Sequence, residues 1–184
     1  MREILRPFTC LLICFLTVVM LPVVSVADGP VRGEMANFVM HPTPKPLSEI
    51  KFQDKNGETL SLGDFKGKLV FFHLWATWCA PCRREMPNVD FLQTKYMGRA
   101  FQVIALSLDR KGIDAVASFY RDVGISNLTI YLDQEAKTAR KLRARGLPLT
   151  ILLDAKGEEI GRLVGPANWK SHDAQRLIEF FIEK

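Results

Sequence analysis

The sequence has few cysteines and histidines, and this scarcity argues against two common kinds of small exported protein. Only four cysteines and three histidines occur in 184 residues. A fold held together by disulfides carries several cysteines at wide spacings, whereas Cys79 and Cys82 are the only cysteines after residue 14. A structural zinc site is also disfavoured, because there is no second CxxC pair and the histidines lack ligand spacing.

A strong charge of either sign is missing as well. The formal net charge is +5, and the basic residues are too scattered to indicate nucleic-acid binding, although the excess favours acidic partners. No internal repeat or low-complexity tract is present. The length suits one ordinary globular domain with an appendage.

Residues 1–27 have the pattern of an export signal. Arg2 and Arg6 precede an uncharged apolar run over residues 8–26, and small residues at 25–27 suit signal peptidase. Because such a run is also long enough to cross a bilayer, an uncleaved anchor in the inner membrane is the alternative. Under either interpretation, the domain that follows is expected to be exported.

The rest of the chain predicts a linker and one α/β domain. Residues 28–46 are rich in Gly and Pro and predict a flexible linker before a domain at 47–184. In that domain apolar runs alternate with helical stripes, and two hairpins are expected, at Asn56-Gly57 and Lys156-Gly157. This order predicts a mixed central sheet with helices on both faces. Strands are expected at 69–76, 101–108, 128–132, 149–153 and 159–164, and helices at 79–97, 114–123, 134–143 and 171–182.

Cys79 and Cys82 lie where the first buried strand gives way to a helix. Free N–H groups and the dipole at a helix N-terminus favour a negative charge, which lowers the pKa of a thiol at that position. Pro81 suits the first helical turn, where no N–H partner is needed. Cys82 lies one turn further in and is expected to be less exposed. The spacing therefore predicts thiol–disulfide exchange in which Cys79 attacks and Cys82 resolves the mixed disulfide.

Around these cysteines the sequence resembles the thioredoxin superfamily, and within it the TlpA-like periplasmic reductases. The resemblance runs from about residue 47 to the C-terminus. It rests on GKLVFFHLWATWCAPCRREMP, the strand end ALSLD, the segment GLPLTILLDAKGEEIGRLVGPANW and the last helix. The stretch GPANWKSHDAQRLI is the most TlpA-like part. The resemblance implies a thioredoxin-like fold and a periplasmic protein-disulfide reductase that needs no metal or organic cofactor.

The resemblance assigns the same roles to the two cysteines and adds supporting residues. Trp75 and Trp78 match aromatic residues beside the redox centre, with ordinary core packing as the alternative for Trp75. Pro148, preceded by Leu147, matches a cis-proline that faces the disulfide and helps to pair the substrate backbone.

His73 departs from the pattern of the relatives. It stands where thioredoxins carry an acidic residue that exchanges protons with the resolving thiol, and where TlpA-like proteins more often have Asn. An imidazole titrates in the right range for that exchange. A buried, neutral, hydrogen-bonded core histidine is the simpler interpretation.

The resemblance also implies partners. These are disulfide-containing exported proteins as substrates and a membrane electron donor of the CcdA or DsbD type, in cytochrome or cytochrome-oxidase maturation. Two alternatives are a disulfide-inserting oxidant that uses the same residues and a copper-handling module that uses Met35, Met40 and His41. The basic residues between 137 and 145 are interpreted as a solvated helix face, and the alternative is that they steer acidic partners.

Overall fold

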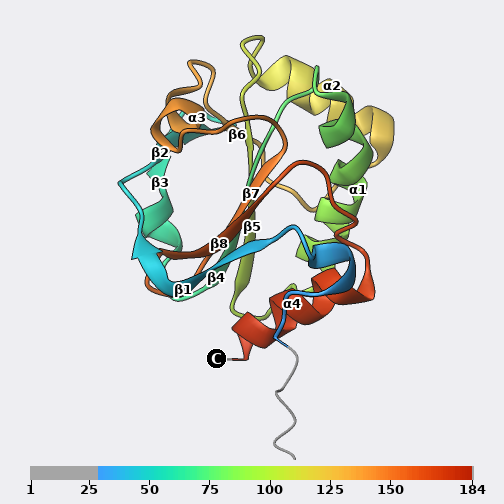
Figure 1. Ribbon diagram of the computed structural model, residues 1–184. Coiled ribbons are helices and arrows are strands. Elements are labelled where there is room, and N and C mark those ends of the chain that lie inside the picture. Colours follow the sequence, from blue (N-terminus) through green and yellow to red (C-terminus); the bar gives the residue numbers. More distant parts are fainter. Residues whose placement is uncertain (1–28, 184) are drawn as a thin grey trace, which may run out of the picture.

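The computed structural model describes residues 29–183, and a mixed sheet forms the centre of this part (Figure 1). The strands are β1 (Val39–Pro46), β2 (Lys51–Asp54), β3 (Thr59–Ser61), β4 (Leu69–Trp75), β5 (Phe101–Ser107), β6 (Tyr131–Leu132), β7 (Leu149–Leu153) and β8 (Glu158–Val164). Their order across the sheet is β1-β8-β7-β4-β5-β6-β2-β3. The pairs β4–β5 and β5–β6 are parallel and the other described pairs are antiparallel.

Helices cover both faces of the sheet, as predicted. They are α1 (Ala80–Lys95), α2 (Ile113–Val123), α3 (Lys137–Lys141) and α4 (His172–Ile182), with short 3₁₀ helices η1 (Gly33–Met35) and η2 (Leu62–Phe65). Figure 1 shows α1, α2 and α4 on one side of the sheet and α3 on the other. The strand expected at 128–132 and the helix expected at 134–143 are both present but shorter than predicted.

Strand β4 is buried along its whole length and divides the core in two. Because successive side chains of a strand point to opposite faces, Phe71 and Trp75 pack in the cluster that contains α1, α2 and α4. Val70, Phe72 and Leu74 pack in a second cluster, with β2 and residues near α3. The continuous apolar run at 69–76 is therefore explained by burial on both faces.

The linker predicted for residues 28–46 is wrong for its larger part. The 3₁₀ helix η1 packs against α4, and β1 forms the edge of the sheet by pairing with β8. Prolines at 42, 44 and 46 suggested a linker, but an edge strand tolerates proline because one side of it needs no hydrogen-bond donors. Met35 and Phe38 also anchor this segment, because both are buried in the core.

The predicted export segment, residues 1–27, lies outside the described residues. Between residues 29 and 183, no helix is long and apolar enough to cross a membrane.

Gly161 in β8 allows β1 to approach closely. A Cβ atom at this position would lie 2.5 Å from the carbonyl oxygen of Val39 and 2.6 Å from the ring of Phe38. We therefore expect Gly161→Ala to displace β1 and to lower the free energy of unfolding by about 1–3 kcal/mol, measured by urea denaturation. Gly146→Ala is the matched control, since a Cβ there meets nothing within 4 Å. Equal unfolding midpoints for the two variants would contradict the tight contact.

Candidate active site

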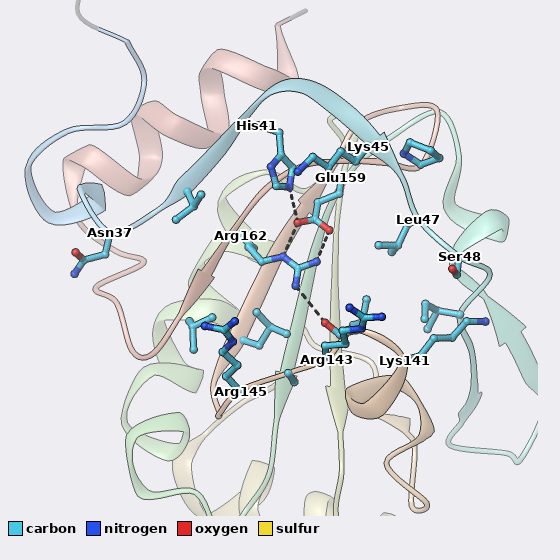
Figure 2. Close-up of a pocket in the computed structure, with 17 residues that line it drawn as sticks. Asn37, His41, Lys45, Leu47, Ser48, Lys141, Arg143, Arg145, Glu159 and Arg162 are labelled. Atoms are coloured by element: carbon cyan, nitrogen blue, oxygen red, sulfur yellow. Dashed lines mark hydrogen bonds and ion pairs between the residues drawn. The ribbon is translucent and has the colours of Figure 1, made fainter.

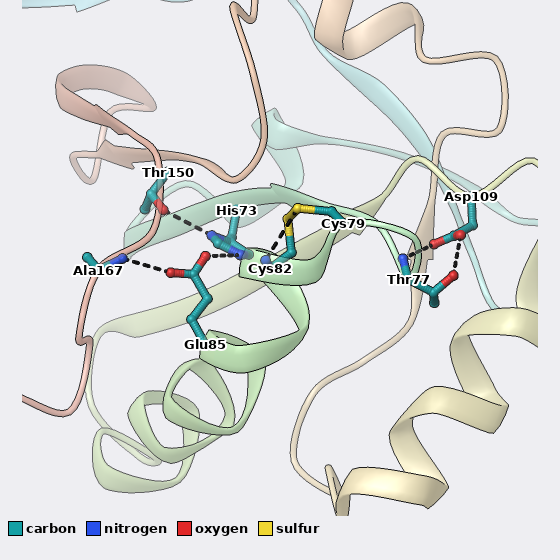
Figure 3. The surroundings of a disulfide bond; sticks show 8 residues. All are labelled: His73, Thr77, Cys79, Cys82, Glu85, Asp109, Thr150 and Ala167. Atoms are coloured by element: carbon teal, nitrogen blue, oxygen red, sulfur yellow. Dashed lines mark hydrogen bonds and ion pairs between the residues drawn. A yellow bond between two sulfur atoms is a disulfide. The ribbon is translucent and has the colours of Figure 1, made fainter.

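The disulfide between Cys79 and Cys82 closes the first turn of α1 (Figure 3). Cys79 is the N-cap residue, and its Sγ accepts a hydrogen bond from the backbone N–H of Cys82 at 3.3 Å. Cys79 is 7% exposed, whereas Cys82 is 0% exposed. The expected difference in exposure is therefore present, and an incoming sulfur reaches Cys79 first. Pro81 lies in the first turn of the helix, as expected.

The turn before Cys79 is fixed by an aspartate that the sequence-based prediction missed. Asp109, just after β5, accepts hydrogen bonds from the backbone N–H of Thr77 at 2.8 Å and from the Thr77 hydroxyl at 2.6 Å. The hydroxyl of Ser107 donates to the same carboxylate at 2.7 Å. The end of β5 therefore holds the loop that presents Cys79. The sequence did contain a signal for this role, because the apolar run of β5 leads into the polar residues Ser107 and Asp109.

The two tryptophans of the motif lie in different surroundings. Trp75 is fully buried, and its ring lies 5.3 Å from that of Phe119 and 5.8 Å from that of Tyr120. The core-packing interpretation therefore describes Trp75. Trp78 is 68% exposed, next to the disulfide in the chain, and it is available to contact another molecule.

Leu147 and Pro148 lie at the end of β4 that leads to Cys79. Their peptide bond is cis, as the resemblance implied. Leu149 pairs with Leu74, so the register places Pro148 level with the last residue of β4. Half-buried Leu147 lines a hollow of about 620 Å³ together with Trp78. The exposed tryptophan and the residue before the cis-proline thus border one surface feature.

Next to Cys82 lies a buried pair of titratable side chains (Figure 3). Glu85 follows Cys82 by three residues and therefore shares its face of α1. Glu85 Oε1 lies 3.3 Å from Nε2 of His73, and Oε2 accepts the backbone N–H of Ala167 at 3.0 Å. Nδ1 of His73 lies 2.9 Å from the hydroxyl oxygen of Thr150. His73 is thus a buried, hydrogen-bonded histidine, as the simpler interpretation held.

Burial keeps both members of this pair uncharged near neutral pH. It lowers the pKa of His73 to about 3. It also raises the pKa of Glu85 to about 8, although the hydrogen bond from Ala167 opposes this shift. At pH 7 the imidazole is therefore in its neutral form, and the pair holds one titratable proton, on the carboxyl of Glu85. Their contact then joins two neutral groups rather than an ion pair.

Glu85 was missed by the sequence-based prediction, although a signal was present. Cys82, Glu85, Met86 and Val89 follow one another at the spacing of a single helix face, and all four are buried. Only the contact with His73, which comes from β4, shows that the carboxyl on this face lies beside a second titratable group.

The donors named for the copper alternative lie in different surroundings. Met35 is buried in the core, Met40 is 42% exposed, and Nε2 of His41 lies 2.9 Å from Glu159. Across residues 29–183, no cluster of three or more His, Cys, Asp or Glu side chains could hold a metal ion.

Comparison with known proteins identifies the family. The family model named Redoxin matches residues 42–178, which include both cysteines, His73 and Glu85. The chain belongs to the Redoxin family. The Redoxin match begins inside β1 and ends within α4, so it covers nearly all of the described fold.

Several relatives of this Redoxin-family chain carry names that refer to thiol chemistry. The "Thiol-disulfide oxidoreductase ResA" of Bacillus thuringiensis (strain Al Hakam) is 34% identical over 112 residues, which are 61% of this chain and 64% of that protein. The chain thus spans slightly less than two thirds of that relative. ResA of Bacillus subtilis (strain 168) is 29% identical over 156 residues, or 84% of this chain and 78% of the relative.

A solved structure also matches the Redoxin-family fold. The DsbF homologue of Corynebacterium diphtheriae aligns with a TM-score of 0.63 and 27% identity, covering 80% of this chain and 93% of that one. The predicted thioredoxin-like fold is confirmed by such neighbours.

Proposed function

We propose that this chain is an exported thiol–disulfide oxidoreductase that reduces disulfides in partner proteins. The observation that carries this function is the position of the cysteine pair. Cys79 caps α1 and keeps 7% of its surface exposed, whereas Cys82, one turn further in, is completely buried. Such a pair separates the attacking thiol from the resolving thiol, as exchange requires. The names of the ResA relatives support the same activity.

The proposed reaction moves two electrons to the partner in two exchanges. The thiolate of reduced Cys79 attacks one sulfur of the partner's disulfide, and a mixed disulfide forms while the partner's other sulfur leaves as a thiolate. Cys82 then loses its proton and attacks the sulfur of Cys79. This step forms the Cys79–Cys82 disulfide and releases the partner's second thiolate. A dithiol donor must afterwards return two electrons and two protons to the pair.

The resolving step needs an acceptor for the proton of Cys82. Glu85 shares the helix face of Cys82, and burial raises the pKa of its carboxyl to about 8, close to the pH range in which a thiol loses its proton. The fraction of Glu85 that is ionised can take up the proton of the thiol. We therefore assign proton transfer in the resolving step to Glu85, with His73 as the neutral group that packs against its carboxyl.

The substrate is proposed to bind across Trp78, Leu147 and Pro148. Trp78 supplies an exposed aromatic surface. Pro148 has no N–H, so the strand that starts here leaves room for an incoming backbone near the sulfur of Cys79.

The cellular setting is inferred from the sequence. Residues 1–27 have the pattern of a signal or anchor, which favours the periplasm with or without a tether to the inner membrane. The segment GPANWKSHDAQRLI favours the TlpA-like branch. That branch implies electron supply from a membrane protein of the CcdA or DsbD type and a role in cytochrome or cytochrome-oxidase maturation.

The reduction potential separates a reductase from a disulfide-inserting oxidant. Pro81 follows the pattern of reducing thioredoxins, whereas a histidine at this position would further stabilise the thiolate of Cys79. We expect an equilibrium potential closer to about −270 mV than to about −120 mV, measured against glutathione. A value above about −150 mV would assign the protein to the oxidants. The Cys79→Ser, Cys82→Ser double variant, which has no exchangeable pair, is the control.

A further inference from the structure

A second hollow, of about 640 Å³, lies beside the loop that leads to Pro148. Strands β1 and β8 form one wall, and the loop at residues 142–145 forms the other (Figure 2). Ala144 also lines the hollow that contains Trp78, so the same loop borders both. A polypeptide bound near Pro148 can therefore extend into this second hollow.

The lining of this hollow, which we call the basic hollow, has a strong excess of positive charge. Its lysines and arginines are Lys45, Lys141, Arg143, Arg145 and Arg162. Glu159 is the one carboxylate among the lining residues, and its charge is already balanced. Arg162 donates to it from Nε at 2.6 Å and from Nη2 at 2.5 Å, and His41 contacts it at 2.9 Å.

Of the other four cations, Lys141 donates to the backbone carbonyl of Glu49, and the remaining three have no such partner. Lys45, Arg143 and Arg145 are exposed, and no carboxylate of residues 29–183 forms an ion pair with them. Figure 2 shows them placed around the ion pair of Arg162 and Glu159. Like charges around a concave surface with a low-dielectric floor concentrate the electric field, and this attracts anionic groups.

The backbone at Arg143 is unusual for a surface cation. Its φ is 52°, in the left-handed region that favours glycine or asparagine. The backbone N–H groups of Arg143 and Ala144 donate to the carbonyls of Arg140 and Ala139, at 3.0 and 2.9 Å. The end of α3 thus holds Arg143 in this conformation, at the rim of the basic hollow.

We propose that the basic hollow binds an acidic segment of the substrate protein, which is the protein whose disulfide Cys79 attacks. The proposal rests on the function proposed above and adds the chemistry of the substrate: aspartates or glutamates a few residues from the cystine. A peptide is favoured because the basic hollow continues from the loop before Pro148, where the substrate backbone is expected. Its floor includes the apolar side chains of Ile50 and Leu149, which suit an extended chain.

Two peptides with the same cystine loop test this assignment, one flanked by four aspartates and one by four asparagines. We expect the reduced protein to reduce the acidic peptide with a kcat/KM about ten-fold higher at low ionic strength. About 0.5 M NaCl should remove most of this preference, since exposed charges are screened. In parallel, a cysteine-free tetra-aspartate peptide should bind the oxidised protein in a fluorescence titration.

Charge-reversal variants test whether the preference for the acidic peptide comes from the cations of the basic hollow. Arg143→Glu, Arg145→Glu should abolish both the preference and the binding. Lys55→Glu, Arg121→Glu makes the same change in charge at exposed positions outside the basic hollow and should retain both. Should the first variant unfold, Arg143→Asn, Arg145→Gln replaces it, because asparagine tolerates the left-handed conformation. Circular dichroism checks the folding of each variant.

The outcomes separate this assignment from the function it rests on. If neither peptide is reduced, the proposed function is wrong, while the titration still tests the basic hollow. If both are reduced equally and the tetra-aspartate peptide does not bind, the assignment of the basic hollow is wrong. Binding to phosphatidylglycerol vesicles that depends on Arg143 and Arg145, without binding of the acidic peptide, would also overturn it in favour of a membrane surface.

Discussion

Replacing Cys82 with serine is expected to stop turnover and to leave the protein joined to its partners through Cys79. The thiolate of Cys79, which keeps 7% exposure, can still attack, but the fully buried resolving thiol is missing, so the mixed disulfide persists. We expect disulfide reduction to slow by at least about 100-fold. Non-reducing gels of cell extracts that contain the variant should show higher-mass adducts, and added dithiothreitol should dissolve them.

Cys79→Ser provides the matched comparison. It keeps Cys82, which is 0% exposed, and should therefore form few adducts and show no reductase activity. Adducts formed equally well through Cys82 in this variant would mean that the order of attack is reversed. The double serine variant sets the background for both measurements.

The second large effect is on the pH dependence of stability. The buried pair of His73 and Glu85 should make the free energy of unfolding of the oxidised protein vary with pH. In the unfolded chain Glu85 titrates near 4.5 and His73 near 6.5, whereas in the fold their pKa values are about 8 and about 3. From pH 4.5 to 6.5 the pair holds one proton in either state, on Glu85 when folded and on His73 when unfolded. Its contribution to the free energy of unfolding should be constant there.

Outside this window the folded and unfolded states hold different numbers of protons. Between pH 6.5 and 8 the folded pair keeps the proton of Glu85 while the unfolded pair has none, so stability falls as pH rises. Between pH 4.5 and 3 the unfolded pair holds two protons and the folded pair one, so stability falls as pH falls. Each slope is at most about 1.4 kcal/mol per pH unit, and the loss over each limb is about 2 kcal/mol.

Urea denaturation from pH 3 to pH 8.5 measures this profile. The His73→Asn, Glu85→Gln variant has neither titration, so subtracting its profile from that of the wild type isolates the pair. Glu85→Gln alone should remove the alkaline limb, and His73→Asn alone the acidic limb. Equal slopes for the wild type and the double variant between pH 6.5 and 8 would show that Glu85 is ionised in the fold.

Elements that carry their own local signals were predictable from the sequence. The apolar run of β4, the turn at Asn56-Gly57 between β2 and β3, and the cap at Ser171 each depend on neighbouring residues, and all are present. The position of Cys79 at the start of α1 follows in the same way from the strand and the helix on either side of it.

Features that depend on distant parts of the chain were not predictable. Strand β1 needs β8 as a partner, and its prolines indicate a linker unless the sheet edge is known. Glu85 stands next to Arg84 and suggests a charged surface, because nothing local indicates that His73 lies opposite it. Trp75 and Trp78 are three residues apart in one motif, and only the path of the chain after β4 makes the first a core residue and the second an exposed one.

The pairing of β1 with β8 also has a consequence for biosynthesis. It joins the first strand of the described chain to the last, so β1 has no partner until residues 158–164 have been synthesised. Contacts between such distant segments form slowly, because a long loop must close first. An exported chain has to remain unfolded until it has crossed the membrane. In the export proposed above, a sheet whose first strand pairs with its last would leave the nascent chain without a complete sheet for most of its synthesis.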